Sequence, residues 1–164
     1  MRARLSTFGR RREQAFTLIE AMIAVAIVAI LATVVYPSYA AYIFRAKVNR
    51  AVSDIREMEM ALDRYYIATN GGQPPTLAGI GYEARLDPWG RTYQYLPYAD
   101  LVRAGKKHPK GARMDKKLKP INSDYDLYSL GEDGMSAPPL NAKPSLDDVV
   151  RAGDGAFVGL ADDF

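Results

Sequence analysis

Glu20 is the only charged residue in segment 16–36, FTLIEAMIAVAIVAILATVVY. A carboxylate inside an apolar span costs a few kcal/mol unless it is paired or reaches the membrane interface. Glu20 is close enough to the N-terminal end of the segment to reach the lipid headgroups. A positive partner is the alternative, because a cut between Ala15 and Phe16 would create a free amine one helical turn away. The position therefore predicts either a headgroup contact or a charge pair.

A second group of polar residues lies near the C-terminus, between Leu130 and Asp148. Its oxygen-bearing side chains are Glu132, Asp133, Ser136, Asn141, Ser145, Asp147 and Asp148. Calcium takes about six to eight oxygen ligands, usually carboxylates together with backbone carbonyls. Gly131 and Gly134 permit tight turns, but the EF-hand spacing is absent. From the residues alone, the segment is either a calcium loop or an acidic, solvated loop.

Catalytic chemistry finds little support in the sequence. The chain has no cysteine and a single histidine, His108. It contains no phosphate-binding glycine motif, and the spacing of its carboxylates identifies no acid–base pair. We therefore expect no catalytic residues and no enzyme activity.

Basic residues are concentrated in two places. The first fifteen residues carry five arginines and one glutamate, so the rest of the chain has a net charge of −1 although the whole chain has +3. The run 103–119 holds eight basic side chains and one acid, Asp115. Such a run can bind DNA, anionic lipid or an acidic partner, but it lacks the aromatic residues that stack on single strands. We expect a solvated, flexible loop there and no nucleic-acid binding.

The apolar segment 16–36 predicts a membrane anchor. As a helix of about 30 Å it would span the hydrocarbon core of a bilayer. The basic leader 1–15 would stay in the cytoplasm by the positive-inside rule, which places the C-terminal part across the membrane. A cleaved secretory signal is the alternative. The apolar stretch is too long for one, and an amphipathic helix continues directly from its end.

Residues 37–70 have the pattern of an amphipathic stem helix. Apolar side chains recur every three or four positions, at Val48, Val52, Ile55, Met58, Leu62 and Tyr65. This is the helical period. The charged residues are expected on the other faces: Arg50, Asp54, Arg56, Glu57, Asp63 and Arg64.

The anchor and the stem are expected to form one helix over about residues 17–69. Three tyrosines mark the membrane interface, as an aromatic belt does: Tyr36, Tyr39 and Tyr42. The helix should end near Asn70-Gly71-Gly72. Pro37 has no amide donor, so we expect it to kink the helix or melt it locally.

Residues 71–164 are expected to form the globular part. The clearest strands are TYQYL (92–96) and YDLYSL (125–130), and VVRA (149–152) and AFVGL (156–160) are weaker candidates. The only tryptophan, Trp89, is expected to pack rather than to bind a ligand. A long N-terminal helix packed on a small antiparallel sheet makes an α+β fold.

The stretch QAFTLIEAMIAVAIVAILA closely resembles the class III signal of type IV pilins and type II secretion pseudopilins. The resemblance implies that prepilin peptidase cleaves between Ala15 and Phe16 and methylates the new amine of Phe16. It implies that Glu20 pairs with the N-terminus of a neighbouring subunit during assembly. Pro37 falls where this family commonly has a helix-perturbing proline. The chain departs from the family at Ala15, where glycine is usual.

Two further motifs, DPWGRTYQY and YDLYSLGEDG, resemble the major pseudopilin of type II secretion systems. In that family the second motif leads into a calcium loop. Carried over to this chain, the resemblance implies calcium ligands at the Leu130 carbonyl, Asp133 and Asp148, with Asp147 and Ser145 as further candidates.

The resemblance also implies the function. We expect a filament-forming pseudopilin of a type II protein secretion system, a homopolymer with other pilin-like subunits. Its further partners would be prepilin peptidase, the inner-membrane assembly platform and membrane lipid. It would be a single-pass inner-membrane protein with its C-terminal domain in the periplasm, and a periplasmic filament after assembly. A type IV pilus or DNA-uptake filament is one alternative, and a static one-span protein with a periplasmic calcium-binding module is another.

Overall fold

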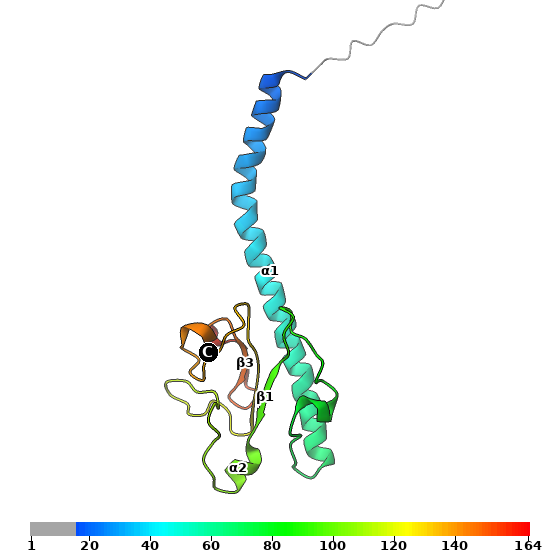
Figure 1. The fold of residues 1–164 in the computed structure, drawn as a ribbon, viewed down its shortest axis with the longest axis vertical. Coiled ribbons are helices and arrows are strands. Elements are labelled where there is room, and N and C mark those ends of the chain that lie inside the picture. The colour runs from blue at the N-terminus through cyan, green and yellow to red at the C-terminus, as the bar shows by residue number, and fades with distance from the viewer. Residues whose placement is uncertain (1–15) are drawn as a thin grey trace, which may run out of the picture. The chain divides into compact units, whose positions relative to one another are not determined.

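The computed structural model describes residues 16–164, apart from the side chains of Val34 and Pro37. The leader 1–15, with Ala15 on the N-terminal side of the expected cut, lies outside the described residues. The chain forms two units, which meet after Ala41 and are treated separately below. Helix α1 (Leu18–Ala68) contributes to both, and its bounds agree with the predicted helix to within one residue at each end (Figure 1).

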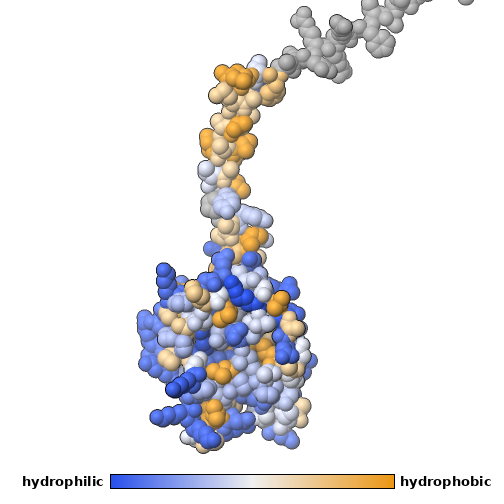
Figure 2. Space-filling view, viewed as in Figure 1, coloured by the Kyte–Doolittle hydropathy of each residue, from blue (hydrophilic) through white to orange (hydrophobic). Residues whose placement is uncertain are grey.

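The N-terminal unit contains the first part of α1, and its side chains are exposed and almost all apolar. Leu18, Ile19 and Val25 are each more than 60% exposed. In Figure 2 the upper part of this helix is mostly orange and tan, the colours of hydrophobic residues, with paler patches lower down. The helix is long and apolar enough to cross a membrane. Its secondary structure continues without a break across residue 37, so the expected local melting at Pro37 does not occur.

The C-terminal unit, Tyr42–Phe164, is built on a four-stranded antiparallel sheet. The strands are β1 (Gln94–Pro97), β2 (Tyr125–Ser129), β3 (Val149–Ala152) and β4 (Phe157–Leu160), and they lie side by side in this order. A short helix, α2 (Ala99–Arg103), follows β1 and was not expected from the sequence. The α+β class is confirmed, and each strand begins within two residues of its predicted start.

The two faces of the sheet have separate hydrophobic cores. The face towards α1 packs Tyr125, Leu127 and Val149 against helix residues that include Val48, Ile55, Met58 and Leu62. The other face packs Val150 and Ala152 against Ile121 and Leu140, which come from the long connections before β2 and β3. Because neighbouring strand residues point to opposite faces, the strands also carry apolar side chains on the second face. Residues of the two connections cover these side chains.

Trp89 packs at the edge of the first core, as expected. It is partly buried against that core, and its ring centroid lies 6.3 Å from that of Phe44.

The prediction that Asp54 lies on the outer side of the stem helix is wrong. Its side chain is buried; its Oδ1 lies 2.5 Å from Nη2 of Arg85 and its Oδ2 accepts a hydrogen bond of 3.0 Å from the Tyr93 hydroxyl. Both partners come from the segment between α1 and β1. A charge at the border of an apolar helical face can be buried when such partners arrive from elsewhere in the chain.

Candidate functional site

The first turn of α1 is closed by a reciprocal pair, Thr17 and Glu20. The backbone N–H and the hydroxyl of Thr17 donate to Oε2 of Glu20 at 2.9 and 2.7 Å, and the Glu20 N–H lies 3.3 Å from the Thr17 hydroxyl oxygen. The Thr17 carbonyl accepts the first helical bond, from Ala21 at 3.2 Å. This is a capping box, in which the side chain of each residue accepts a hydrogen bond from the backbone N–H of the other.

The role of Thr17 was missed in the sequence, although the T-x-x-E spacing that indicates a capping box is present there. An ionised carboxylate has about four lone-pair sites. The two bonds from Thr17 both reach the same oxygen of Glu20. Glu20 is exposed, so its carboxylate can also accept a cationic partner without releasing Thr17.

We predict that Thr17→Val weakens the helix start and that Thr17→Ser preserves it. Loss of an N-cap costs about 1 kcal/mol, which corresponds to a roughly fivefold larger open population of the first turn. Hydrogen exchange of the amides of residues 18–22 in detergent micelles measures this opening. Equal exchange in the valine and serine variants would contradict the capping role.

The loop between β2 and β3, residues 130–148, begins with a turn held by two carboxylates. Oδ2 of Asp147 accepts the backbone N–H groups of Glu132 and Asp133 at 2.7 and 2.8 Å. Oδ1 of Asp133 accepts the N–H of Met135 at 2.7 Å. Each carboxylate therefore already serves as a cap for backbone amides.

Two more of the proposed calcium ligands, Leu130 and Ser145, also have protein partners. The Leu130 carbonyl accepts the N–H of Gly134 at 3.2 Å. The Ser145 hydroxyl exchanges two hydrogen bonds of 2.9 Å with the backbone of Ala137, one as acceptor and one as donor. Ser145 thus fastens the two arms of the loop to each other.

Asp148, the last of the proposed ligands, is completely buried beside a guanidinium. Its Oδ2 accepts hydrogen bonds from Arg113 and, at 2.6 Å, from the Ser136 hydroxyl. Burial raises the pKa of the Asp148 carboxyl to about 6, against the opposing effects of Ser136 and Arg113. Removing a carboxylate from water favours its neutral form, so the nearby positive charge is needed to keep Asp148 ionised.

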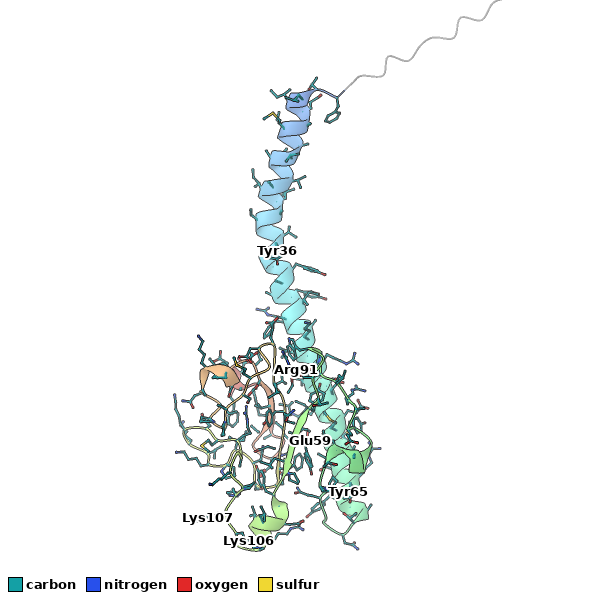
Figure 3. All side chains as sticks on the ribbon, viewed as in Figure 1. Tyr36, Glu59, Tyr65, Arg91, Lys106 and Lys107 are labelled. Atoms are coloured by element: carbon teal, nitrogen blue, oxygen red, sulfur yellow. The ribbon has the colours of Figure 1, made fainter. Side chains whose placement is uncertain are left out.

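The expectation that run 103–119 is wholly a solvated loop is wrong at Arg113. The Arg113 side chain is 2% exposed, and its guanidinium lies 4.2 Å from the centre of the Tyr128 ring. Arg103 also has protein partners, the Gly71 carbonyl and the Tyr66 hydroxyl, each at 2.7 Å. The six lysines of the run are exposed, and Lys106 and Lys107 lie just after α2 (Figure 3).

Comparison with known proteins relates the start of the helix, and most of the chain, to known families. Residues 10–36 match the prokaryotic N-terminal methylation motif. The type II secretion system core protein G of Pseudomonas aeruginosa is 36% identical over 76% of this chain and 87% of its own length. The protein of the same name in Vibrio cholerae is 36% identical over 76% and 84%, and that of Dickeya chrysanthemi 31% identical over 89% and 92%.

The chain belongs to the core protein G family. This confirms the resemblance to the pseudopilins of type II secretion. No solved structure gives a significant match.

As they lie in the structure, the proposed calcium ligands are not gathered into a calcium site, and the carboxylate of Asp148 already has a cation beside it. Among residues 16–164, no three histidine or acidic side chains lie close enough together to hold a metal. The carboxylates of Asp133 and Asp147 cap backbone amides, and that of Asp148 is bound to Arg113. Calcium binding by this chain stays a prediction from the resemblance.

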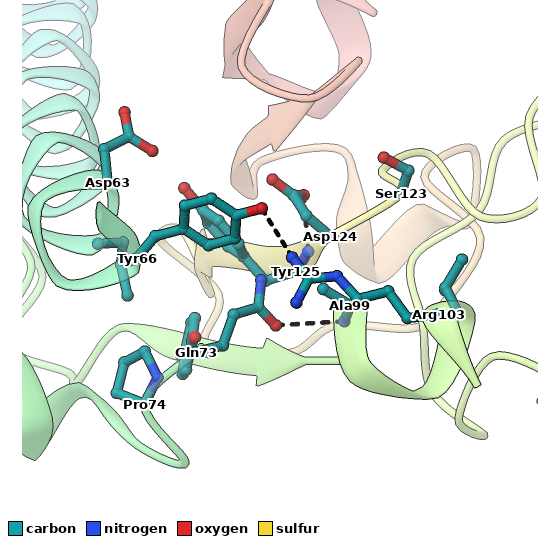
Figure 4. Close-up of a pocket in the computed structure, with 12 residues that line it drawn as sticks. Asp63, Tyr66, Gln73, Pro74, Ala99, Arg103, Ser123, Asp124 and Tyr125 are labelled. Atoms are coloured by element: carbon teal, nitrogen blue, oxygen red, sulfur yellow. Dashed lines mark hydrogen bonds between the residues drawn. The ribbon is translucent and has the colours of Figure 1, made fainter. Parts of the chain in front are cut away.

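A cavity of about 370 Å³ in the C-terminal unit lies between the end of α1, helix α2 and the start of β2. Figure 4 shows Arg103 reaching across it to the Tyr66 hydroxyl. Gln73 accepts the N–H of Ala99 at 3.2 Å on another wall. These contacts tie the end of α1 and the segment that follows it to α2.

Proposed function

We propose that the protein is a filament-forming pseudopilin of a type II secretion system. Residues 16–36 would hold it in the inner membrane and would later form the core of the filament. The observation that carries this proposal is the first part of α1, which exposes apolar side chains along its length and one carboxylate near its start. Such a surface needs lipid or other helices around it.

Processing would prepare the helix start for assembly. Prepilin peptidase would cut between Ala15 and Phe16, and the new amine of Phe16 would be methylated. In the filament this amine would pair with Glu20 of a neighbouring subunit. The capping box supports this step because Thr17 fixes the Glu20 carboxylate at the helix start and leaves it room for a cation.

The partners and location follow from the same scheme. The subunit would wait as a single-pass protein with its C-terminal unit in the periplasm, in contact with lipid and with an inner-membrane assembly platform. Homopolymerisation with other pilin-like subunits would replace lipid by neighbouring helices, so that the apolar surface never meets water. The proposed role is mechanical and structural, with no catalytic step.

A DNA-uptake role is not proposed. Two of the eight basic side chains in run 103–119, Arg103 and Arg113, bind other parts of the protein. The curated relatives carry the name of a secretion component.

The intact mass of the protein purified from its native membrane tests the proposal. We expect a chain that begins at Phe16 and carries one additional methyl group. Purification from cells without prepilin peptidase is the control and should return the chain with residues 1–15 attached. Retention of these residues in normal cells would instead indicate a static one-span protein.

A further inference from the structure

The guanidinium of Arg113 binds three oxygens of the loop 130–148. It donates to the Asp148 carboxylate, to the Ser136 hydroxyl and, at 2.8 Å, to the Ala137 carbonyl. These oxygens come from two arms of the loop that are about ten residues apart in sequence. Carboxylate, hydroxyl and carbonyl oxygens are also the kinds of ligand that a calcium ion takes.

We propose that Arg113 takes the place of the calcium ion that the family resemblance assigns to this loop. The loop then closes around a positive charge that is part of the chain, and its folding does not depend on calcium. The proposal concerns the C-terminal unit alone and stands whether or not the chain polymerises.

The position of Arg113 is fixed by its surroundings. Its backbone N–H donates to Asp126 of β2 at 2.7 Å, and its carbonyl accepts the N–H of Ile121 at 2.9 Å. The next residue, Met114, exchanges backbone hydrogen bonds of 2.9 Å with Pro138 and Leu140 of the loop. Arg113 is therefore part of the wall of the loop, and its backbone is held by contacts within the protein.

A second arginine binds the other end of the loop. The guanidinium of Arg91 donates to the carbonyls of Gly131 and Glu132 at 2.7 and 3.2 Å. A calcium ion in this turn would need oxygens of the same kind, and here they face a second positive charge. The two arginines together take carbonyl, hydroxyl and carboxylate oxygens from both ends of the loop.

Two buried atoms of the Arg113–Asp148 ion pair have no hydrogen-bond partner, and they are of the kinds that a guanidinium and a carboxylate can join to each other. They are Nε of Arg113 and Oδ1 of Asp148. The Nε–H and one Nη–H of a guanidinium point the same way and can bind both oxygens of a carboxylate. A small rotation of the Arg113–Asp148 pair would therefore satisfy both atoms without an added ion.

The test compares the melting temperature of the full chain in detergent micelles with excess CaCl₂ and with EGTA, followed by the fluorescence of Trp89. We expect the two melting temperatures to agree to within about 1 °C, because a ligand that does not bind the folded state does not stabilise it. A melting temperature more than about 3 °C higher in CaCl₂ would overturn the proposal.

Two variants distinguish the contribution of Arg113 to stability from that of its carboxylate partner. Arg113→Met should lower the melting temperature by about 10 °C or more, since it leaves the buried Asp148 without its charge partner. The double variant Arg113→Met with Asp148→Leu should recover at least half of this loss, because neither charge is then left alone. No recovery in the double variant would contradict the pairing.

Asp133→Ala is the matched control, and it keeps the test decisive even if Arg113→Met does not fold. Asp133 is a calcium ligand in the family-based prediction and a cap for Met135 in the structure. The cap predicts the same modest loss of stability in CaCl₂ and in EGTA. A loss that appears only in CaCl₂ would show that an ion is bound and would overturn the proposal.

Discussion

Replacing Glu20 by glutamine is expected to leave the protein in the membrane and to reduce its polymer by a factor of about 100 or more. Glutamine can still accept the hydrogen bonds of Thr17, since a capping box tolerates either residue. It carries no charge, so the methylated amine of the neighbouring subunit would be buried without a partner. An unpaired buried charge costs about 3–5 kcal/mol, which is at least a hundredfold in an association constant.

Sheared filament fractions and cross-linking in the membrane measure this loss. Glu20→Leu, which removes both the cap and the charge, should assemble no better than Glu20→Gln. Ile27→Leu is the control within the same apolar segment and should assemble normally. Normal polymer yield from Glu20→Gln would mean that Glu20 serves the helix start alone.

The second large effect is expected at Arg151, which joins α1 to the sheet. This buried residue of β3 donates to Glu59 of α1 at 2.9 Å and to both oxygens of Asp124 at 2.8 and 2.9 Å. Its guanidinium lies 4.1 Å from the centre of the Tyr125 ring. Arg151→Met leaves Asp124 without a cation and Glu59 with Arg56 alone, at 2.9 Å, and should lower the free energy of unfolding by about 3 kcal/mol.

Urea unfolding of the full chain in micelles measures this change. Arg64→Met is the matched control. Arg64 is exposed on α1, and among the contacts described its side chain bonds only to the Met60 carbonyl. Its effect should stay within about 0.5 kcal/mol. A loss below about 1 kcal/mol in Arg151→Met would show that Glu59 and Asp124 are adequately solvated without the arginine.

The parts of the fold that follow from local pattern were predictable from the sequence. The three-to-four-residue spacing from Val48 to Tyr65 predicted the buried face of α1, and all of its members except Val52 and Tyr65 are buried. The alternation of aromatic and polar residues located β2 to within one residue of its C-terminal end. Such signals depend on neighbours along the chain, which are visible in a single sequence.

The buried charges were not predictable in the same way. Arg113 meets its carboxylate 35 residues later in the chain, and Asp54 meets Arg85 31 residues later. Each looks like an ordinary surface charge within its own segment, and only the fold brings the partners together. Thr17 is different, since its partner is three residues away and the motif that pairs them can be recognised directly.

The packing of α1 on the sheet has a mechanical consequence. The buried residues from Val48 to Leu62 cover about 21 Å of helix at 1.5 Å per residue. A force along the helix axis would load these contacts and the Arg151 bridge in parallel, as shear, instead of peeling them apart one after another. Because all of these contacts share the load, a subunit that is pulled by its helix can carry tension while its sheet stays folded.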